Sequence, residues 1–233
     1  DILSSENLRK EGVSEEKIKF VGNIMIDTLE SNREKAAQLK IYDIIKANII
    51  DIHNRELSTL NIELNAFALI TLHRPSNVDQ KEVLEPLMRF LLDEVSKDMP
   101  IIWPIHPRTR KQLENFELWE EVLSHPHMIL LFPLGYHNML CLNMDATIML
   151  SDSGGLQEEC TVLGTPCLTL RWNTERPITL REHGGASVLV GNNVERIRKE
   201  YEQTLKFNRK PQRPEIWDGQ TAGRVLEAIL EAD

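Results

Sequence analysis

Two glycines and a serine follow one of the apolar runs of the sequence. The run 147–150, TIML, is followed directly by the segment 151–159, SDSGGLQEE. Gly154 and Gly155 allow a ligand to approach the backbone closely, and the helix expected after them would present free N–H groups and the positive end of its dipole. Ser153 adds a hydroxyl donor. This combination of donors predicts a site for a phosphate or a diphosphate.

Two acidic residues of the same segment leave alternatives open. Glu159 lies about one and a half turns into the expected helix, at a spacing where its carboxylate could accept hydrogen bonds from ribose hydroxyls. Asp152 is typical of a cap on a tight strand–helix turn, and on that interpretation the segment binds no ligand. A pair of glycines is too short a motif to decide between the two.

Cationic side chains follow three further apolar runs. The run 67–72 is followed by His73, the run 101–105 by His106 and Arg108, and the run 167–170 by Arg171 and Arg176. Ligands of open α/β sheets bind beyond the carboxyl ends of the strands, so we expect these side chains at one edge. In an acidic chain, cations gathered at one edge favour an anion-binding site. The structural alternatives are a histidine bonded to a loop backbone and a Glu–Arg pair that closes a loop.

Other catalytic motifs are missing from the sequence. It has no Walker A motif, no GxGxxG after a strand, and no pair of carboxylates beside the strand-end cations that would suit acid–base chemistry. The HxH at 125–127 has no supporting carboxylate, so we expect no metal site. Cys141, Cys160 and Cys167 include no CxxC pair, which predicts buried thiols in a reducing compartment.

Length and charge narrow the class of protein. The 233 residues contain 27 Lys and Arg against 36 Asp and Glu, a formal net charge of −9. This acidic balance argues against nucleic acid as a partner. No apolar run reaches the roughly 18 residues of a membrane span, and no basic segment followed by an apolar one marks a signal peptide. We therefore expect a cytoplasmic protein with no membrane and no nucleic-acid partner.

Short apolar runs alternate with segments of helical periodicity along the chain. Several runs lack in/out alternation, which is typical of parallel strands buried on both faces. The alternation predicts an α/β fold with a doubly wound, mostly parallel sheet. The expected strands are residues 17–21, 67–73, 101–105, 128–132, 147–150, 167–170 and 187–190. The expected helices are residues 23–40, 79–97 with Asp79 as N-cap, 107–114, 137–144, 154–163, 176–183, 194–205 and 221–232.

The sequence also predicts a division of the chain into a domain, a linker and a terminal helix. We expect residues 1–208 to form the main domain, residues 209–218 a proline-containing linker, and residues 219–233 a carboxyl-terminal helix. Residues 41–65 are apolar enough for helices but contain few start and stop signals. The chain opens without Met and, on its pattern, in mid-strand, which predicts a piece of a longer protein.

Seven sequence blocks carry a family resemblance. In order, they are FVGNIMIDTL (20–29), LITLHRPSNVD (69–79), PIHPRT (104–109), FPLGYHNML (132–140), LSDSGGLQEEC (150–160), LGTPCLTLRWNTERP (163–177) and WDGQTAGRV (217–225). Together they resemble the non-hydrolysing UDP-N-acetylglucosamine 2-epimerases. The resemblance spans nearly the whole chain, and the combination of DSGGxQEE with NTERP is highly specific.

The resemblance implies an architecture and a set of site residues. The family has the two-domain glycosyltransferase-B architecture, and this chain matches only its carboxyl-terminal, Rossmann-like half, which holds most of the UDP. By resemblance, the diphosphate is held by Ser153, Gly154 and Gly155, the ribose by Glu159, the phosphates by Arg176 and His73, and the uracil by Tyr136 and Met139. The resemblance makes His73 important in turnover. His106 and Arg108 join the UDP site because they follow a neighbouring strand.

The resemblance also implies a reaction. In the family, the sugar C2 proton is removed and UDP is eliminated in the anti sense, giving a glycal; UDP then adds back with C2 inverted and forms UDP-N-acetylmannosamine. No metal and no redox cofactor take part. The catalytic carboxylates belong to the amino-terminal half, so we expect this chain alone to bind UDP weakly and to be inactive. The full-length protein is expected to be a homodimer that binds UDP and UDP-N-acetylglucosamine.

Three other functions stay open at this point. They are a hydrolysing epimerase that releases UDP and free N-acetylmannosamine, a glycosyltransferase of the same architecture, and a nucleotide-sugar-binding module without catalysis. The paired SGGLQEE and NTERP blocks argue against the glycosyltransferase. In this architecture the last helix commonly crosses to the other half, so we expect this chain to expose the apolar side chains Val225, Leu226, Ile229 and Leu230.

Overall fold

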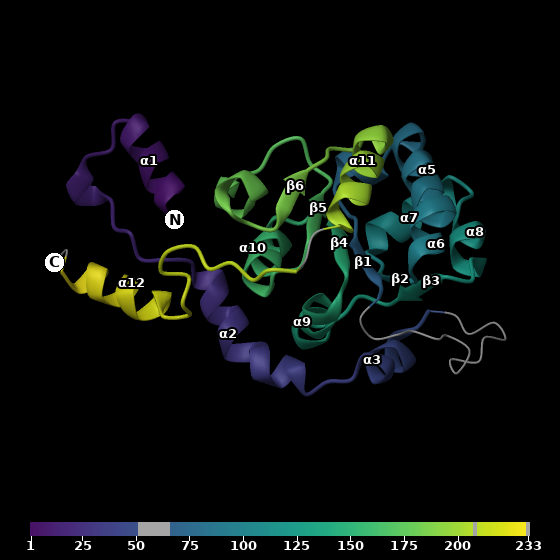
Figure 1. Cartoon of the computed structure of the whole chain (residues 1–233), viewed down its shortest axis with the longest axis horizontal. Helices are drawn as coiled ribbons and strands as arrows, with labels where there is room; N and C mark the ends of the chain where they lie inside the picture. Colours follow the sequence, from purple (N-terminus) through teal and green to yellow (C-terminus); the bar gives the residue numbers. More distant parts are fainter. Residues whose placement is uncertain (51–65, 207–208, 232–233) are drawn as a thin grey trace.

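Six parallel strands form the centre of the computed structural model, which describes residues 1–50, 66–206 and 209–231 (Figure 1). The strands are β1 (Ala68–Thr71), β2 (Ile101–Pro104), β3 (Met128–Leu131), β4 (Ile148–Ser151), β5 (Cys167–Thr169) and β6 (Ser187–Leu189). Their order in the sheet is β3-β2-β1-β4-β5-β6, and every neighbouring pair is parallel. The expected doubly wound parallel sheet is therefore confirmed.

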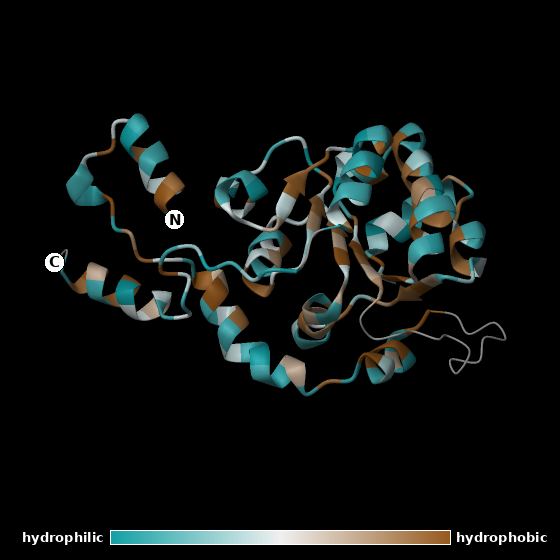
Figure 2. Cartoon of the chain, in the orientation of Figure 1, coloured by the Kyte–Doolittle hydropathy of each residue, from teal (hydrophilic) through white to brown (hydrophobic). Residues whose placement is uncertain are grey.

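Both faces of the sheet are buried, because successive residues of a strand point to opposite sides. In β1, Leu69 packs in one apolar core and Ile70 in the other, and Met149 and Leu150 of β4 divide in the same way. All four residues are at most 1% exposed. Figure 2 shows apolar strands at the centre, with helices around them that carry polar residues. The three cysteines are buried, as expected.

Helices cover both faces of the sheet. One face carries α4 (Pro75–Val78), α5 (Lys81–Phe90), α7 (Pro107–Asn115), α8 (Trp119–Ser124) and α11 (Val194–Thr204). The other carries α2 (Ile24–Ala37), α3 (Ile41–Asn48), α9 (Tyr136–Asp145) and α10 (Gly154–Leu163). α5 continues through a π-helical turn, Leu91–Val95, into α6 (Ser96–Asp98). The helices expected at 107–114, 137–144, 154–163 and 194–205 are confirmed within one residue at each end.

β1 and β4 lie side by side at the centre of the sheet, and the chain leaves them toward opposite faces. α4 and α5 follow β1 on one face, while α10 follows β4 on the other. Such a switch opens a crevice at the carboxyl ends of the two strands, where doubly wound folds bind their ligands. The register aligns Thr71 with Ser151, so the residues that follow both strands meet at this crevice.

Two expectations for the first residues are wrong. The chain does not open in mid-strand, because α1 (Ile2–Lys10) begins there and the Asp1 side chain caps it by accepting the N–H of Ser4. The strand expected at 17–21 does not form either: Glu15–Lys17 is a 3-10 turn, and residues 18–23 contain no regular element. Local pattern cannot reveal whether an apolar run finds a neighbouring strand, since its partners are distant in sequence.

Two expectations near the site are also wrong. The helix expected at 176–183 is two short 3-10 turns, Pro177–Thr179 and Arg181–His183, because Leu180 between them is extended. Asp79 is not an N-cap: α5 begins after Gln80, and the Asp79 carboxylate pairs with an arginine instead. Leu180 forms an isolated parallel bridge with Ser187, and Asp79 pairs with Arg108, so in both places a contact with a distant segment accompanies the difference.

The last helix, α12 (Thr221–Leu230), lies with α1 at the end of the molecule away from the sheet (Figure 1). Residues 209–220 lead to it without a helix or strand. The carboxylate of Asp27 in α2 accepts hydrogen bonds from the N–H groups of Thr221 and Ala222, at 3.0 and 2.7 Å. α12 is therefore fixed at its start to the helix that leads into the sheet domain.

α12 presents an apolar face to solvent, as expected. Leu226, Ile229 and Leu230 are 59%, 57% and 66% exposed, and Val225 is partly exposed. None of the helices described here is long and apolar enough to cross a membrane. Residues 51–65 of the expected helical stretch 41–65 lie outside the described residues, and the domain boundaries at 208 and 218 stay predictions.

Candidate functional site

His73, at the carboxyl end of β1, is fixed by Asp152 at the end of β4. Its Nδ1 lies 2.9 Å from Asp152 Oδ1, and its backbone N–H donates to Oδ2 at 3.0 Å. The Arg74 N–H and the Asn77 amide donate to the same carboxylate at 2.8 and 3.1 Å. Burial would raise the pKa of Asp152, but the hydrogen bonds from His73 and Arg74 outweigh it and lower the pKa. The ionised Asp152 thus fixes Nδ1 as a protonated nitrogen and orients the ring.

The histidine that follows β2 lies beside the one that follows β1. The ring centroids of His73 and His106 are 5.4 Å apart. His106 also caps α7, because its Nδ1 accepts the N–H of Arg108 at 3.1 Å. The Arg108 guanidinium pairs with Asp79, and this hydrogen bond lowers the pKa of Asp79 to about 2. The structure therefore brings the two histidines together and engages Arg108 in a separate ion pair.

The glycine turn follows β4 and is tied to β1. Ser151 Oγ lies 2.7 Å from Thr71 Oγ1 and accepts the N–H of Ser153 at 3.0 Å. α10 begins immediately afterwards, so its free N–H groups and the positive end of its dipole lie at the crevice. A Cβ at Gly154 would lie 2.5 Å from Arg176 Nη1, so any larger residue there would displace the end of the arginine side chain. The start of the helix and the arginine are therefore in direct proximity.

Arg176 is held by two carboxylates of unequal burial. Its Nε lies 3.2 Å from Glu158 Oε2, and its Nη1 pairs with Glu175 Oε1. The side chain of Glu158 is 10% exposed, and that of Glu175 is 53% exposed. A 2.7 Å hydrogen bond from Arg171 is the main reason that the pKa of Glu175 is lowered to about 2. The Glu–Arg pair that the sequence suggested as a loop closure does form, and it lies beside the glycine turn.

Successive residues of α10 contact different parts of the site, because residues of a helix follow one another at about 100°. Gln157 is fully buried, and its Oε1 accepts from Thr174 Oγ1 at 2.9 Å and from Thr179 Oγ1 at 3.3 Å. Thr174 Oγ1 in turn accepts the N–H of Arg176 at 3.0 Å. The helix thus holds the loop, which is a physical reason for the SGGLQEE and NTERP blocks to occur together.

Glu159 lies on the side of α10 that faces α9. It is 5% exposed, and burial raises its pKa to about 7, although Tyr136 and Asn143 lower it in part. Burial raises the pKa of Tyr136 as well. Met139, further along α9, packs against the apolar core of this face, and Gly155 is partly exposed at the start of α10. The structure thus brings Tyr136 and Glu159 together.

Sequence reasoning misses the residues that hold this site together. It interprets Asp152 as a turn cap, whereas the structure makes it the anchor of His73. A signal for this role exists, since Asp152 directly follows a buried strand and a histidine follows another. Gln157 and Glu158 carry no such signal. The partner of Glu158 is Asn23, which is 135 residues away in the sequence.

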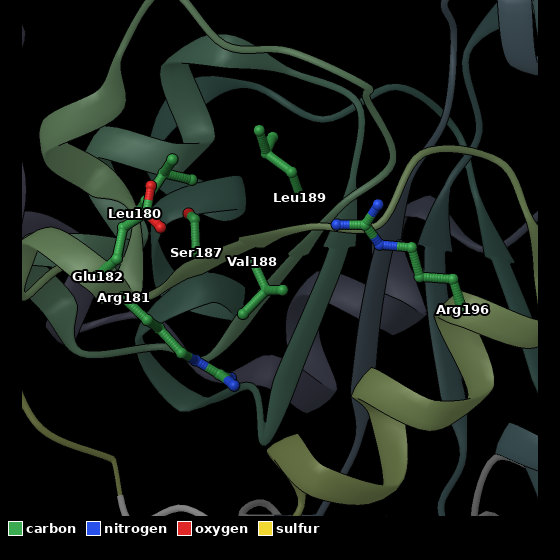
Figure 3. A pocket seen from close by; sticks show the side chains of 7 residues that line it. All are labelled: Leu180, Arg181, Glu182, Ser187, Val188, Leu189 and Arg196. Carbon is green, nitrogen blue, oxygen red and sulfur yellow. The ribbon is translucent and has the colours of Figure 1, made fainter.

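A separate hollow lies along the edge strand β6 (Figure 3). It encloses about 380 Å³ and is lined by Leu180, Arg181, Glu182, Ser187, Val188, Leu189 and Arg196. None of the predicted site residues lines it.

Within the described ranges, no group of three or more His, Cys, Asp or Glu residues could hold a metal ion. Because the hollow along β6 contains none of the predicted site residues, we take the crevice between β1 and β4 as the candidate site.

The fold and this crevice define the class of protein: a Rossmann-like α/β domain in which a helix N-terminus, histidine and arginine side chains converge at the switch point of the sheet. Residues 3–230 match the family model described as UDP-N-acetylglucosamine 2-epimerase. This chain belongs to that family.

Relatives from two organisms carry the same description. The UDP-N-acetylglucosamine 2-epimerase of Methanocaldococcus jannaschii is 34% identical over 229 residues, which are 97% of this chain and 58% of the relative. That of Methanococcus maripaludis is 37% identical over 230 residues, with the same coverage. The crystal structure of the M. jannaschii enzyme in complex with UDP-GlcNAc and UDP matches this whole chain with a TM-score of 0.82 and 34% identity. The match covers 59% of the M. jannaschii chain in that structure, so this chain spans somewhat over half the length of these relatives.

Proposed function

We propose that this chain is the UDP-binding half of a UDP-N-acetylglucosamine 2-epimerase, an isomerase that interconverts UDP-GlcNAc and UDP-ManNAc. One observation carries the proposal: the start of α10, Arg176 and the anchored His73 converge at the crevice between β1 and β4. Each group offers hydrogen-bond donors or positive charge, which suits a diphosphate. The M. jannaschii relative, crystallised with UDP-GlcNAc and UDP, supports the same ligand class.

In this proposal the nucleotide lies along the carboxyl edge of the sheet. The diphosphate contacts Ser153, Gly154, Gly155, Arg176 and His73, the ribose hydroxyls donate to Glu159, and the uracil lies near Tyr136 and Met139. His106 borders the diphosphate through its position beside His73. Arg108 adds positive charge near the rim, although its pair with Asp79 reduces its effect.

The chemistry of these residues is the stabilisation of a departing anion. When the C2 proton is removed and the C1–O bond breaks, a C1=C2 double bond forms and UDP takes the electron pair on its phosphate oxygen. The helix N-terminus and Arg176 stabilise that charge without rearrangement. His73, held by Asp152 through Nδ1, directs its Nε2 edge toward the same oxygens.

The base that removes the C2 proton comes from elsewhere in the protein. The carboxylates at this edge already have partners: Asp152 binds His73, and Glu158 and Glu175 bind Arg176. We therefore assign the catalytic carboxylates to an amino-terminal domain that completes the cleft. The complete enzyme is a homodimer in this proposal, and the 233-residue chain alone binds UDP without turnover.

The test joins the amino-terminal part of the M. jannaschii relative to this chain and follows UDP-GlcNAc in D₂O by NMR. The expected product is UDP-ManNAc with deuterium at C2, whereas the chain alone gives no product. Free N-acetylmannosamine would indicate a hydrolysing epimerase instead. UDP binding by the chimera without any product would indicate a binding module, and turnover by the chain alone would contradict the assignment of the base to another domain.

A further inference from the structure

We propose that Glu158 and Asn23 are positioning residues, which hold the Arg176 guanidinium over the start of α10 in the orientation that a diphosphate needs. The inference rests on the function proposed above and deepens it. Neither residue is placed on the ligand, and both act through Arg176.

Glu158 holds Arg176 from the buried side. Its Oε2 lies 3.2 Å from Arg176 Nε, and the residue is 7% exposed. A carboxylate at Nε leaves the two Nη groups of an arginine for another partner. One of them, Nη1, lies 2.5 Å from the position that a Cβ of Gly154 would take. The buried ion pair therefore aims the outer part of the guanidinium at the helix N-terminus.

Asn23 holds Glu158 in turn. Its Nδ2 donates to Glu158 Oε1 at 2.8 Å, while its Oδ1 caps α2. A buried carboxylate requires compensating partners: Asn23 donates a hydrogen bond to one oxygen, and Arg176 Nε lies at ion-pair distance, 3.2 Å, from the other without a hydrogen bond. Asn23 is the last residue of the irregular segment 18–23 and directly precedes α2. The series of contacts from Asn23 through Glu158 to Arg176 therefore starts where the chain enters the sheet domain.

Positioning and simple electrostatics predict opposite results when the charge of Glu158 is removed. Glu158 is negative and lies near the proposed position of an anion, so its neutralisation alone would strengthen UDP binding. If Glu158 positions Arg176, the same change leaves the guanidinium to the exposed Glu175 and weakens UDP binding. The sign of the change therefore distinguishes the two.

The test is calorimetric titration of the chain with UDP and with uridine, for Glu158→Gln and for Asn23→Ser. Serine still caps α2, but its side chain is too short to reach Glu158. We expect both variants to bind UDP about tenfold more weakly, which is about 1.4 kcal/mol, and to bind uridine like the unaltered chain. Glu94→Gln breaks an ion pair with Arg198 on α11, and as a charge-matched control it leaves both affinities unchanged.

A double variant gives a second readout. If Glu158 acts through Arg176, Glu158→Gln no longer weakens UDP binding in the Arg176→Gln background, where only the loss of its negative charge acts. Equal or tighter UDP binding by Glu158→Gln, or an equal loss in both backgrounds, would overturn this inference and leave the proposed function intact. Absence of UDP binding by the unaltered chain would overturn the proposed function, and this inference with it. Asn23→Ser decides the matter if Glu158→Gln does not fold.

Discussion

Several polar side chains of the proposed site are buried and bind other side chains of the same site. Asp152, Gln157 and Glu158 are at most 7% exposed, and each binds a group at the proposed phosphate site or the loop that carries it. Groups fixed in this way need no rearrangement when charge develops on a leaving group. The fold of this region and the proposed phosphate site therefore share the same few polar side chains.

Glu159 is expected to reduce the stability of the fold at neutral pH. Its pKa rises from 4.5 to about 7 on folding because it is buried. The stabilising contribution of its protonated form is therefore complete below about pH 4.5 and is lost as the pH rises through 7. We expect Glu159→Gln to raise the free energy of unfolding by up to about 3 kcal/mol at pH 8, with no gain at pH 4. Denaturant titrations at both pH values test this, and an equal gain at both would contradict it.

Glu175 is expected to compete with the ligand for Arg176. Its carboxylate pairs with Arg176 Nη1 and lies 2.9 Å from the position of a Cβ on Gly154, beside the start of α10. Glu175→Gln should therefore tighten UDP binding by about threefold, because an exposed ion pair is weak and is replaced by the diphosphate. Titration with UDP measures the effect. Glu182→Gln, which removes an equally negative but more exposed side chain, is the control and should leave the affinity unchanged.

At the scale of helices and strands, sequence pattern predicted most of the sheet. Strands buried on both faces are continuous apolar runs, and six of the seven expected strands form. The segment 17–21 has the same local pattern and fails, since pairing depends on partners that the pattern does not show. The four strand ends with glycines or cations belong to β2, β1, β4 and β5, which are adjacent in the sheet. The general rule for doubly wound folds predicts that the ends of these strands meet at one edge. The motifs do not predict the order of the four strands in the sheet.

The end of α10 gives a prediction for element packing. Gly164 ends the helix with φ +75°, and a Cβ there would lie 2.4 Å from the backbone nitrogen of Pro211. Gly184 has a similar φ of +87° and nothing within 4 Å of its Cβ position. Gly164→Ala should therefore destabilise the chain by about 2 kcal/mol more than Gly184→Ala, since only the first adds overpacking to backbone strain. Thermal melts of both variants test the difference, and equal losses would show that residues 209–220 do not pack on α10.

For the whole molecule, the motifs predict which residues contact the ligand, but they do not show which other residues hold those side chains in place. The positions of His73, Gly154 and Arg176 follow from strand ends and from a family resemblance. The roles of Asp152 and Glu158 depend on contacts between segments far apart in the chain, such as the 2.8 Å hydrogen bond from Asn23. Such contacts are properties of the folded chain and leave little local pattern.

The apolar face of α12 is expected to make this chain associate with itself. Leu226, Ile229 and Leu230 are each more than half exposed on one short helix. The double change Leu226→Lys and Leu230→Lys should reduce concentration-dependent association in sedimentation velocity and leave UDP affinity unchanged. Leu205→Lys, at a 37% exposed leucine after α11, is the control. Association that persists in the double variant would show that another surface is responsible.

UDP binding tests the central claim most directly, through the thermal stability of the chain with millimolar UDP, UDP-N-acetylglucosamine, ADP and GDP. A ligand that binds only the folded chain raises its stability by RT ln(1 + [L]/Kd), so that weak binding is also detected. We predict a rise in the melting temperature with the two uridine ligands alone, and its loss in Arg176→Ala and in Glu159→Ala. Equal shifts with all four ligands, or no shift with any, would contradict the assignment of this crevice as a UDP site.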